Sequence, residues 1–320
     1  FNNLLLSLIS VLLLESIYFY NFTTPEFNVN VCQLPFWSIV VFYSWRIFNK
    51  NEIDVRDCIL IGFFASVGFL SKYLFIYLLL SIVLLFLYFI FFKKLKRFDF
   101  KYFIAIEVFI ILLVPHLIWL NENNFITLTY GLKRTGLETS NFLDHLKFPS
   151  IFILKQLAIL LPFFGLLYLL INKFKLKLNL KDKKLLFLVF INLLPILLMI
   201  LTSIITGSRI RTMWMTPFYL FFGVFAVYLF KNQINLKKLN SFLYGFIFLV
   251  LLSPILYSYI SVKQTNKRTD YFGKEIADLV ERRWNKNFSN EIMYVVGDEW
   301  FAGNLSYHLP SRPKWFLELK

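Results

Sequence analysis

The sequence predicts an all-α polytopic membrane protein that carries a small C-terminal α/β piece, and three observations lead to that prediction. The 320 residues are 58% hydrophobic, and their mean hydropathy is +0.64. Apolar residues gather in long runs, and the basic residues are spread unevenly over the connections between those runs. Such a composition excludes an ordinary soluble enzyme, a disordered chain and a disulfide scaffold.

The apolar runs predict the membrane-spanning helices. A helix that crosses about 30 Å of hydrocarbon needs roughly 20 residues. Apolar runs bounded by polar or charged residues lie near 4–20, 35–48, 58–71, 73–92, 102–120, 151–171, 185–205, 212–230 and 240–260. These runs predict about nine spans. The runs 35–48 and 58–71 are short, so their assignment as full spans or as part of a hairpin stays open.

The distribution of charge predicts the orientation of these spans. The chain has 34 Lys and Arg against 19 Asp and Glu, a net charge of +15. One set of alternate connections holds 17 Lys and Arg, and the other set holds 6. By the positive-inside rule the first set faces the cytoplasm, and the loop 121–150 lies outside. Residues 1–261 are therefore interpreted as a transmembrane helical domain. Topology accounts for the basic excess, so no nucleic-acid partner is expected.

Residues 262–320 have the pattern of a small globular piece on the outer side. Apolar residues recur at helical spacing over 272–284, and a strand-like stretch follows at 292–296. A turn and a short helix through 305–307 come next, and then a second strand-like stretch at 315–317. This order predicts a partial α/β domain.

Cationic residues at the predicted outer face are the first candidates for a site. Lys72 lies in a tight hairpin, and Arg209 and Arg211 precede Trp214. Arg offers a planar fork of donors and Lys a compact point charge, so both suit an anionic group such as a lipid-linked phosphate. Interfacial anchors that reach the headgroups are the alternative interpretation.

Further polar residues at the same face are candidates for lining a substrate site, because polar groups near membrane depth are costly. They are Glu26, Asn30, His116, Glu122, Asn124, Tyr130 and Arg134, and the aromatic Trp214 is a further candidate for lining the site. Glu107 and Lys155 lie inside spans and are expected to reach the nearer interface. The sequence has no phosphate-binding glycine loop, nucleophile elbow or cysteine metal motif, so no metal or cofactor is assigned, and a divalent metal is left open.

Four segments carry a resemblance to a known family. The run "LIGFFASVGFLSKY" (Leu60–Tyr73) resembles the "G-x-x-x-G-L-x-x-L-x-K-Y" hairpin of polyprenyl-phosphate-sugar-dependent membrane glycosyltransferases. The blocks Pro115–Gly131, Gly207–Gly223 and Gly297–Phe316 look like successive blocks of the RgtA/B/C/D-like lipopolysaccharide sugar transferases. Those proteins have the GT-C fold, which protein O-mannosyltransferases and the lipid A aminoarabinose transferase share. The similarity covers nearly the whole chain.

The resemblance implies an activity and a location. The implied activity is transfer of a sugar from a polyprenyl-phosphate donor to a lipid-linked, lipopolysaccharide or protein acceptor. The partners would be that donor, a glycolipid or saccharide acceptor and the lipid bilayer. The implied location is the periplasmic face of the bacterial inner (plasma) membrane.

The resemblance also implies roles for single residues. Lys72 matches the lysine near the donor phosphate, and Arg209 or Arg211 matches a basic pair before the family's Trp. Asn30 lies where many relatives carry an Asp in a "T-P-D-A" stretch, which makes it the candidate catalytic position in this chain. The chain opens on Phe1 within an apolar run, so it is interpreted as a fragment, and the main catalytic Asp is expected upstream.

Two other functions stay open at this point. A transporter or flippase for a lipid-linked sugar is one, although the sequence shows no internal repeat and its polar residues gather at one face. A noncatalytic membrane subunit is the other, and an Asn in place of an Asp at position 30 is what it would predict. The sugar, the acceptor and the oligomeric state are not encoded in any of these patterns.

Overall fold

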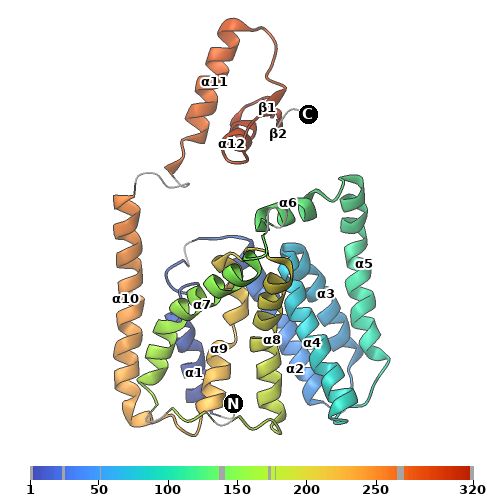
Figure 1. The fold of residues 1–320 in the computed structure, drawn as a ribbon, viewed down its shortest axis with the longest axis vertical. Coiled ribbons are helices and arrows are strands. Elements are labelled where there is room, and N and C mark those ends of the chain that lie inside the picture. The colour runs from blue at the N-terminus through green and yellow to red at the C-terminus, as the bar shows by residue number, and fades with distance from the viewer. Residues whose placement is uncertain are drawn as a thin grey trace. The chain divides into compact units, whose positions relative to one another are not determined.

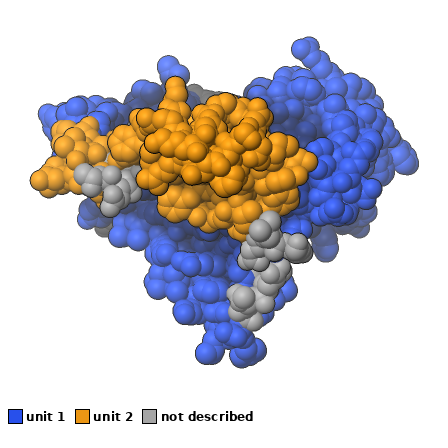
Figure 2. All heavy atoms as spheres, turned by 90° about the horizontal axis from the view of Figure 1, so that it is seen from above, with its two compact units in different colours: residues 1–254 blue, residues 255–320 orange. Residues whose placement is uncertain are grey.

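The structure is a computed structural model that describes residues 3–23, 26–50, 52–136, 141–171, 174–176, 178–264 and 270–317. The chain divides into two compact units, residues 1–254 and 255–320 (Figure 2). The boundary predicted between residues 261 and 262 stays a prediction.

The first unit is built from helices, and the last of them, α10, continues into the second unit (Figure 1). In chain order these are α1 (Leu4–Leu12), η1 (Leu13–Ser16), α2 (Val29–Asn49), α3 (Val55–Ser71), η2 (Tyr73–Phe75), α4 (Ile76–Leu87), η3 (Tyr88–Phe92), α5 (Lys101–Glu122), α6 (Ile126–Thr135), α7 (Asp144–Tyr168), α8 (Lys183–Thr206), η5 (Thr212–Tyr219), α9 (Phe222–Phe230), η6 (Leu236–Lys238) and α10 (Leu239–Lys263). Polar side chains begin several of them, because an Asn or Asp side chain satisfies the free N–H groups of the first turn. Asn28, Asp54 and Asp182 cap α2, α3 and α8 in this way.

The helices confirm the predicted all-α polytopic membrane fold, with fewer spans than the sequence suggested. All nine predicted runs contain helix. Six helices are long and apolar enough to cross a membrane, and η5 with α9, bent by 55°, would make a seventh span. The helix Leu4–Ser16 is shorter than these, and α3 has 17 residues. The structure therefore supports six or seven spans among the described residues.

Aromatic side chains pack α2, η2 and η5 against one another. The ring of Trp37 on α2 lies 5.5 Å from the ring of Phe75 on η2 and 5.1 Å from that of Phe218 on η5, measured between centroids. All three side chains are buried. Aromatic pairs at such distances add to the free energy gained by burying their area. The η2 and η5 corners are thus fixed against α2.

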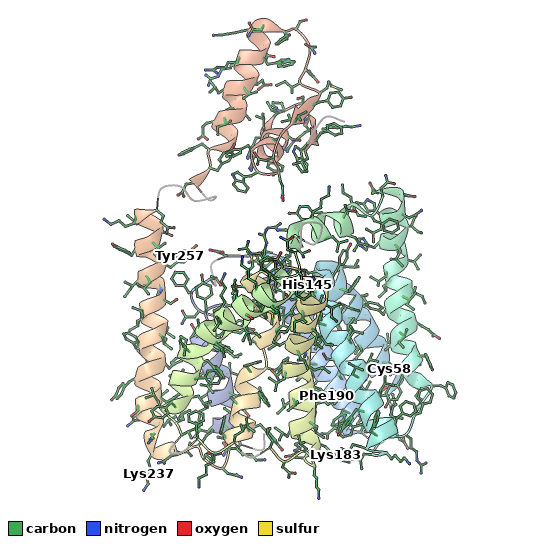
Figure 3. The ribbon with its side chains drawn as sticks, in the orientation of Figure 1. Cys58, His145, Lys183, Phe190, Lys237 and Tyr257 are labelled. Atoms are coloured by element: carbon green, nitrogen blue, oxygen red, sulfur yellow. The ribbon has the colours of Figure 1, made fainter. Side chains whose placement is uncertain are left out.

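Charged side chains gather at one end of the helices of the first unit. At one end, the carboxylate of the buried Asp57 pairs with Arg46 at 3.3 Å and with Lys50 at 3.4 Å. Figure 3 shows Lys183 and Lys237 at this same end and His145 toward the other. We call the first the basic end. Its assignment to the cytoplasm stays a prediction of the positive-inside rule.

A close backbone approach joins α1 to α9 and gives a test of the packing. A Cβ atom added at Gly223 would lie 1.8 Å from the Ser10 carbonyl oxygen, so Gly223→Ala is expected to push the two helices apart. The expected loss of unfolding free energy is about 1–3 kcal/mol, typical of overpacking. Thermal unfolding in detergent measures this loss. Gly165→Ala is the matched control, because no atom lies within 4 Å of its added Cβ. Equal melting of the two variants would contradict the packing described.

The second unit has the predicted α/β character. Its elements are α11 (Gly273–Asn287), β1 (Tyr294–Val296), α12 (Phe301–His308) and β2 (Lys314–Phe316), and the two strands pair in parallel. The apolar residues in and just before α11 differ in exposure. Ala277 is buried, whereas Phe272 is 67% exposed and Leu279 is 45% exposed. Ala277 belongs to the core of this unit, and Val280 and Trp284 of the same helix pack against that core.

Candidate functional site

A cavity of about 920 Å³ lies at the end of the helices opposite the basic end. The segments that line it precede α2, form the corner between α3 and η2, and come from α6 and η5. Six candidates from the sequence line it: Glu26, Asn30, Lys72, Tyr130, Arg134 and Trp214. We call this space the large cavity.

Lys72 is the central cation of the large cavity. It lies between α3 and η2, outside the membrane-spanning segments, with extended backbone. Its ammonium donates a hydrogen bond to the Asn30 Oδ1 atom and lies 5.0 Å from the centroid of the Trp214 ring. Among the described residues no carboxylate forms an ion pair with it. Lys72 is therefore a partly enclosed cation without a paired anion.

This environment changes the acidity of Lys72. The pKa of its ammonium is lowered from 10.5 to about 7, mainly by burial and in smaller part by the positive charge of Arg134. A bound anion would favour the charged form and reverse the shift. Binding of a negative group would therefore stabilise the charged form of Lys72.

Asn30 is held in a fixed orientation by its neighbour. It is 3% exposed, and its backbone N–H and its side-chain Nδ2 both donate to the Asn28 Oδ1 atom at 2.9 Å. Its remaining oxygen therefore faces Lys72. A side-chain amide offers hydrogen-bond donors and an acceptor but no basic group, so this geometry gives Asn30 the role of orienting Lys72.

Tyr73 ties the corner beside Lys72 to α5 and α6. Its hydroxyl lies 2.7 Å from the His116 Nε2 atom and 2.8 Å from the Thr127 Oγ1 atom. The His116 ring stacks on Trp119 at 5.8 Å. His116 was predicted to line the site, but it does not line the large cavity. Tyr73 and Thr127 do line it, although the sequence analysis did not select them.

The other predicted lining residues differ in position. Glu122 and Asn124 are exposed at the turn between α5 and α6 and do not line the large cavity. Arg134 donates a hydrogen bond to the Tyr130 hydroxyl on the same face of α6. Glu26 is exposed and lines the cavity.

Arg209 and Arg211 line a neighbouring cavity of about 610 Å³, which we call the second cavity. The second cavity shares Arg134 and Thr135 with the large cavity. The Arg209 backbone N–H donates to the Thr135 carbonyl at 2.9 Å, which joins the segment before η5 to the end of α6. The cations predicted for one phosphate site thus lie in two adjacent spaces.

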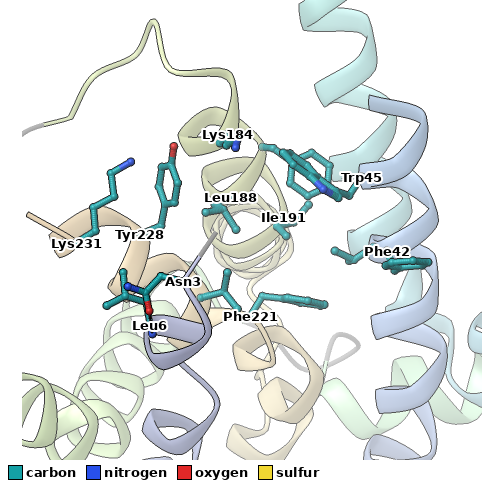
Figure 4. Close-up of a pocket in the computed structure, with 13 residues that line it drawn as sticks. Asn3, Leu6, Phe42, Trp45, Lys184, Leu188, Ile191, Phe221, Tyr228 and Lys231 are labelled. Carbon is teal, nitrogen blue, oxygen red and sulfur yellow. Dashed lines mark hydrogen bonds between the residues drawn. The ribbon is translucent and has the colours of Figure 1, made fainter. Parts of the chain in front are cut away.

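A third cavity, of about 520 Å³, has a different character (Figure 4). It lies among α1, α2, α8 and α9, and most of its lining side chains are apolar. Its cations are Lys184 and Lys231, and the Lys231 ammonium lies 4.0 Å from the centroid of the Tyr228 ring. None of the predicted site residues lines it. Within the described part of the chain, no cluster of three His, Cys, Asp or Glu side chains is placed to hold a metal ion.

These observations describe a multi-pass helical membrane protein with a cationic site at one end of its helices. Residues 3–119 match the family described as dolichyl-phosphate-mannose-protein mannosyltransferase, and the matched region includes Asn30 and Lys72. The match confirms the resemblance and supports a membrane glycosyltransferase of the GT-C type. No curated protein and no solved structure matches the chain.

Proposed function

We propose that this protein transfers a sugar from a polyprenyl-phosphate donor to a lipid-linked, lipopolysaccharide or protein acceptor at the periplasmic face of the bacterial inner membrane. One observation carries the proposal. Lys72 is a partly enclosed cation that hydrogen-bonds Asn30, forms no ion pair with any described residue, and lines a large cavity at one end of membrane-spanning helices. A monophosphate at the end of a lipid tail has the charge that such a site lacks.

The chemistry follows from the charge that develops during transfer. An acceptor hydroxyl attacks the anomeric carbon of the donor, and the bond from that carbon to the phosphate oxygen breaks. The bonding electrons go to the leaving phosphate, and the proton of the acceptor goes to a general base. Lys72 stabilises the growing negative charge, and such help is largest where water is scarce.

Other lining residues would position the donor sugar. The Trp214 ring lies beside the Lys72 ammonium, where it would offer an apolar face to a sugar attached to the bound phosphate. Arg134 lines the same cavity and adds positive charge. In this arrangement the donor phosphate is held beside Lys72, and the sugar lies against the Trp214 ring.

A transfer assay tests the proposed function. Membranes that hold the protein are incubated with a labelled sugar on a short polyprenyl phosphate, and the label is followed into lipid, saccharide and protein fractions. We expect a new glycosidic product that depends on the protein. Movement of intact labelled donor across the membrane without a new bond would instead identify a transporter. Absence of both would favour a noncatalytic subunit.

A further inference from the structure

We propose that the second cavity binds an anionic, phosphate-class group of the acceptor next to the donor bound at Lys72. This inference rests on the proposed function and deepens it, because it names the chemical class of the acceptor. The protein would then have two anion sites, one at Lys72 for the donor phosphate and one in the second cavity for the acceptor.

The second cavity concentrates positive charge from several elements. Five cationic side chains line it: Lys133, Arg134, Lys155, Arg209 and Arg211. Among its described lining residues the sole carboxylate is Asp144, whose Oδ2 atom accepts a hydrogen bond from the Asn141 N–H at 2.9 Å. Like charges around one space repel each other, so a multiply charged anion would stabilise the arrangement more than a single carboxylate.

Three of these cations have no anion of their own. In the part of the chain that the structure describes, no ion pair involves Lys133, Lys155 or Arg209. Lys155 belongs to α7, which is one of the candidate spans, and charged residues within spans usually mark a functional site. The sequence analysis expected Lys155 to reach the nearer interface, and the structure places it in the lining of this cavity.

The position of the second cavity points to the acceptor. Donor and acceptor must meet with the acceptor oxygen against the anomeric carbon, so their sites have to be adjacent. The second cavity shares Arg134 and Thr135 with the large cavity, and the contact from Arg209 to Thr135 fixes the wall between them. If the donor phosphate occupies Lys72, a second anion in this place comes from the other substrate.

Two probes separate the sites in the detergent-solubilised protein. Farnesyl phosphate represents the donor lipid, and inorganic pyrophosphate represents a multiply charged acceptor group. Binding of each is measured by titration calorimetry for the wild type, Lys72→Gln and the double variant Lys155→Gln/Arg209→Gln. Lys147→Gln is the matched control, because Lys147 is an exposed lysine of α7 that does not line the second cavity.

We expect the double variant to bind pyrophosphate at least about tenfold more weakly and farnesyl phosphate unchanged, since it removes two charge-assisted contacts. Lys72→Gln is expected to bind farnesyl phosphate more weakly and pyrophosphate unchanged. Lys147→Gln is expected to bind both probes as the wild type does. The proposal would be overturned if the double variant bound pyrophosphate as well as Lys147→Gln does. It would also be overturned if the two probes competed, because that would indicate one continuous site.

The same titrations distinguish failure of the inference from failure of the proposed function. If the wild type binds no farnesyl phosphate, the donor assignment fails, and the acceptor role fails with it. If farnesyl phosphate binds in a Lys72-dependent way and pyrophosphate does not bind, the proposed function stands and the second site is refuted.

Discussion

Replacing Lys72 by Gln is expected to lower sugar transfer by about 100- to 1,000-fold, the effect of removing one preorganised charge from a transition state. Lys72 lines the large cavity, no carboxylate among the described residues forms an ion pair with it, and its ammonium donates to the Asn30 Oδ1 atom. The measurement is the initial rate of product formation from a labelled polyprenyl-phosphate sugar, normalised to the amount of protein in the membrane.

Two variants sharpen this experiment. Lys72→Arg keeps the charge but changes its shape, so it should retain a larger part of the rate than Lys72→Gln. Lys147→Gln removes an exposed lysine away from both cavities and should behave as the wild type. Equal turnover in Lys72→Gln and the wild type would show that Lys72 serves as an interfacial anchor and not as a phosphate ligand.

The rate of transfer at low donor concentration is expected to fall about tenfold for each pH unit above about pH 7, as binding becomes coupled to the uptake of one proton. The pKa of Lys72 in the free protein is lowered to about 7, so the ammonium is charged below that pH and loses its proton as the pH rises through it. The donor is a phosphodiester, and its charge stays constant over this range. The loss of affinity on the alkaline side therefore belongs to Lys72.

Substitutions at two positions test the assignment of that pH dependence. Arg stays protonated throughout, so Lys72→Arg should flatten the profile up to about pH 9. Asn30→Asp places a carboxylate against the ammonium, which raises the pKa of Lys72 and should move the fall in rate to higher pH. The Trp214 ring beside Lys72 carries no titratable group. Parallel profiles of the wild type and Lys72→Arg would rule Lys72 out as the titrating group.

Local pattern predicted much of the fold. Long apolar runs bounded by charged residues identified every helix of the first unit that could cross a membrane, because hydrocarbon demands length and low polarity whatever the neighbours are. Lys72 could be selected from sequence because it is the only charged residue in its hairpin. The lengths of α1 and α3 were harder to predict, since an apolar residue beyond the end of a helix looks the same in sequence as one inside it.

The site depended more on contacts between distant residues. The hydrogen bonds from Tyr73 to His116 and Thr127 join positions more than forty residues apart, and no spacing rule encodes them. The separation of Arg209 from Lys72 follows from the path of the backbone, which the contact with Thr135 fixes. A polar aromatic residue directly after the hairpin lysine was the one signal that could have pointed to Tyr73.

Under the proposed function, the position of the large cavity also decides how the protein meets its donor. The cavity lies at the ends of membrane-spanning helices and is lined by apolar residues such as Phe19, Leu74 and Leu128. A polyprenyl tail can stay dissolved in the bilayer while its phosphate enters beside Lys72. The encounter is then a search in two dimensions, and the quantity that sets the rate is the mole fraction of donor among the lipids. Diluting the donor with inert lipid should slow transfer even at a constant bulk concentration.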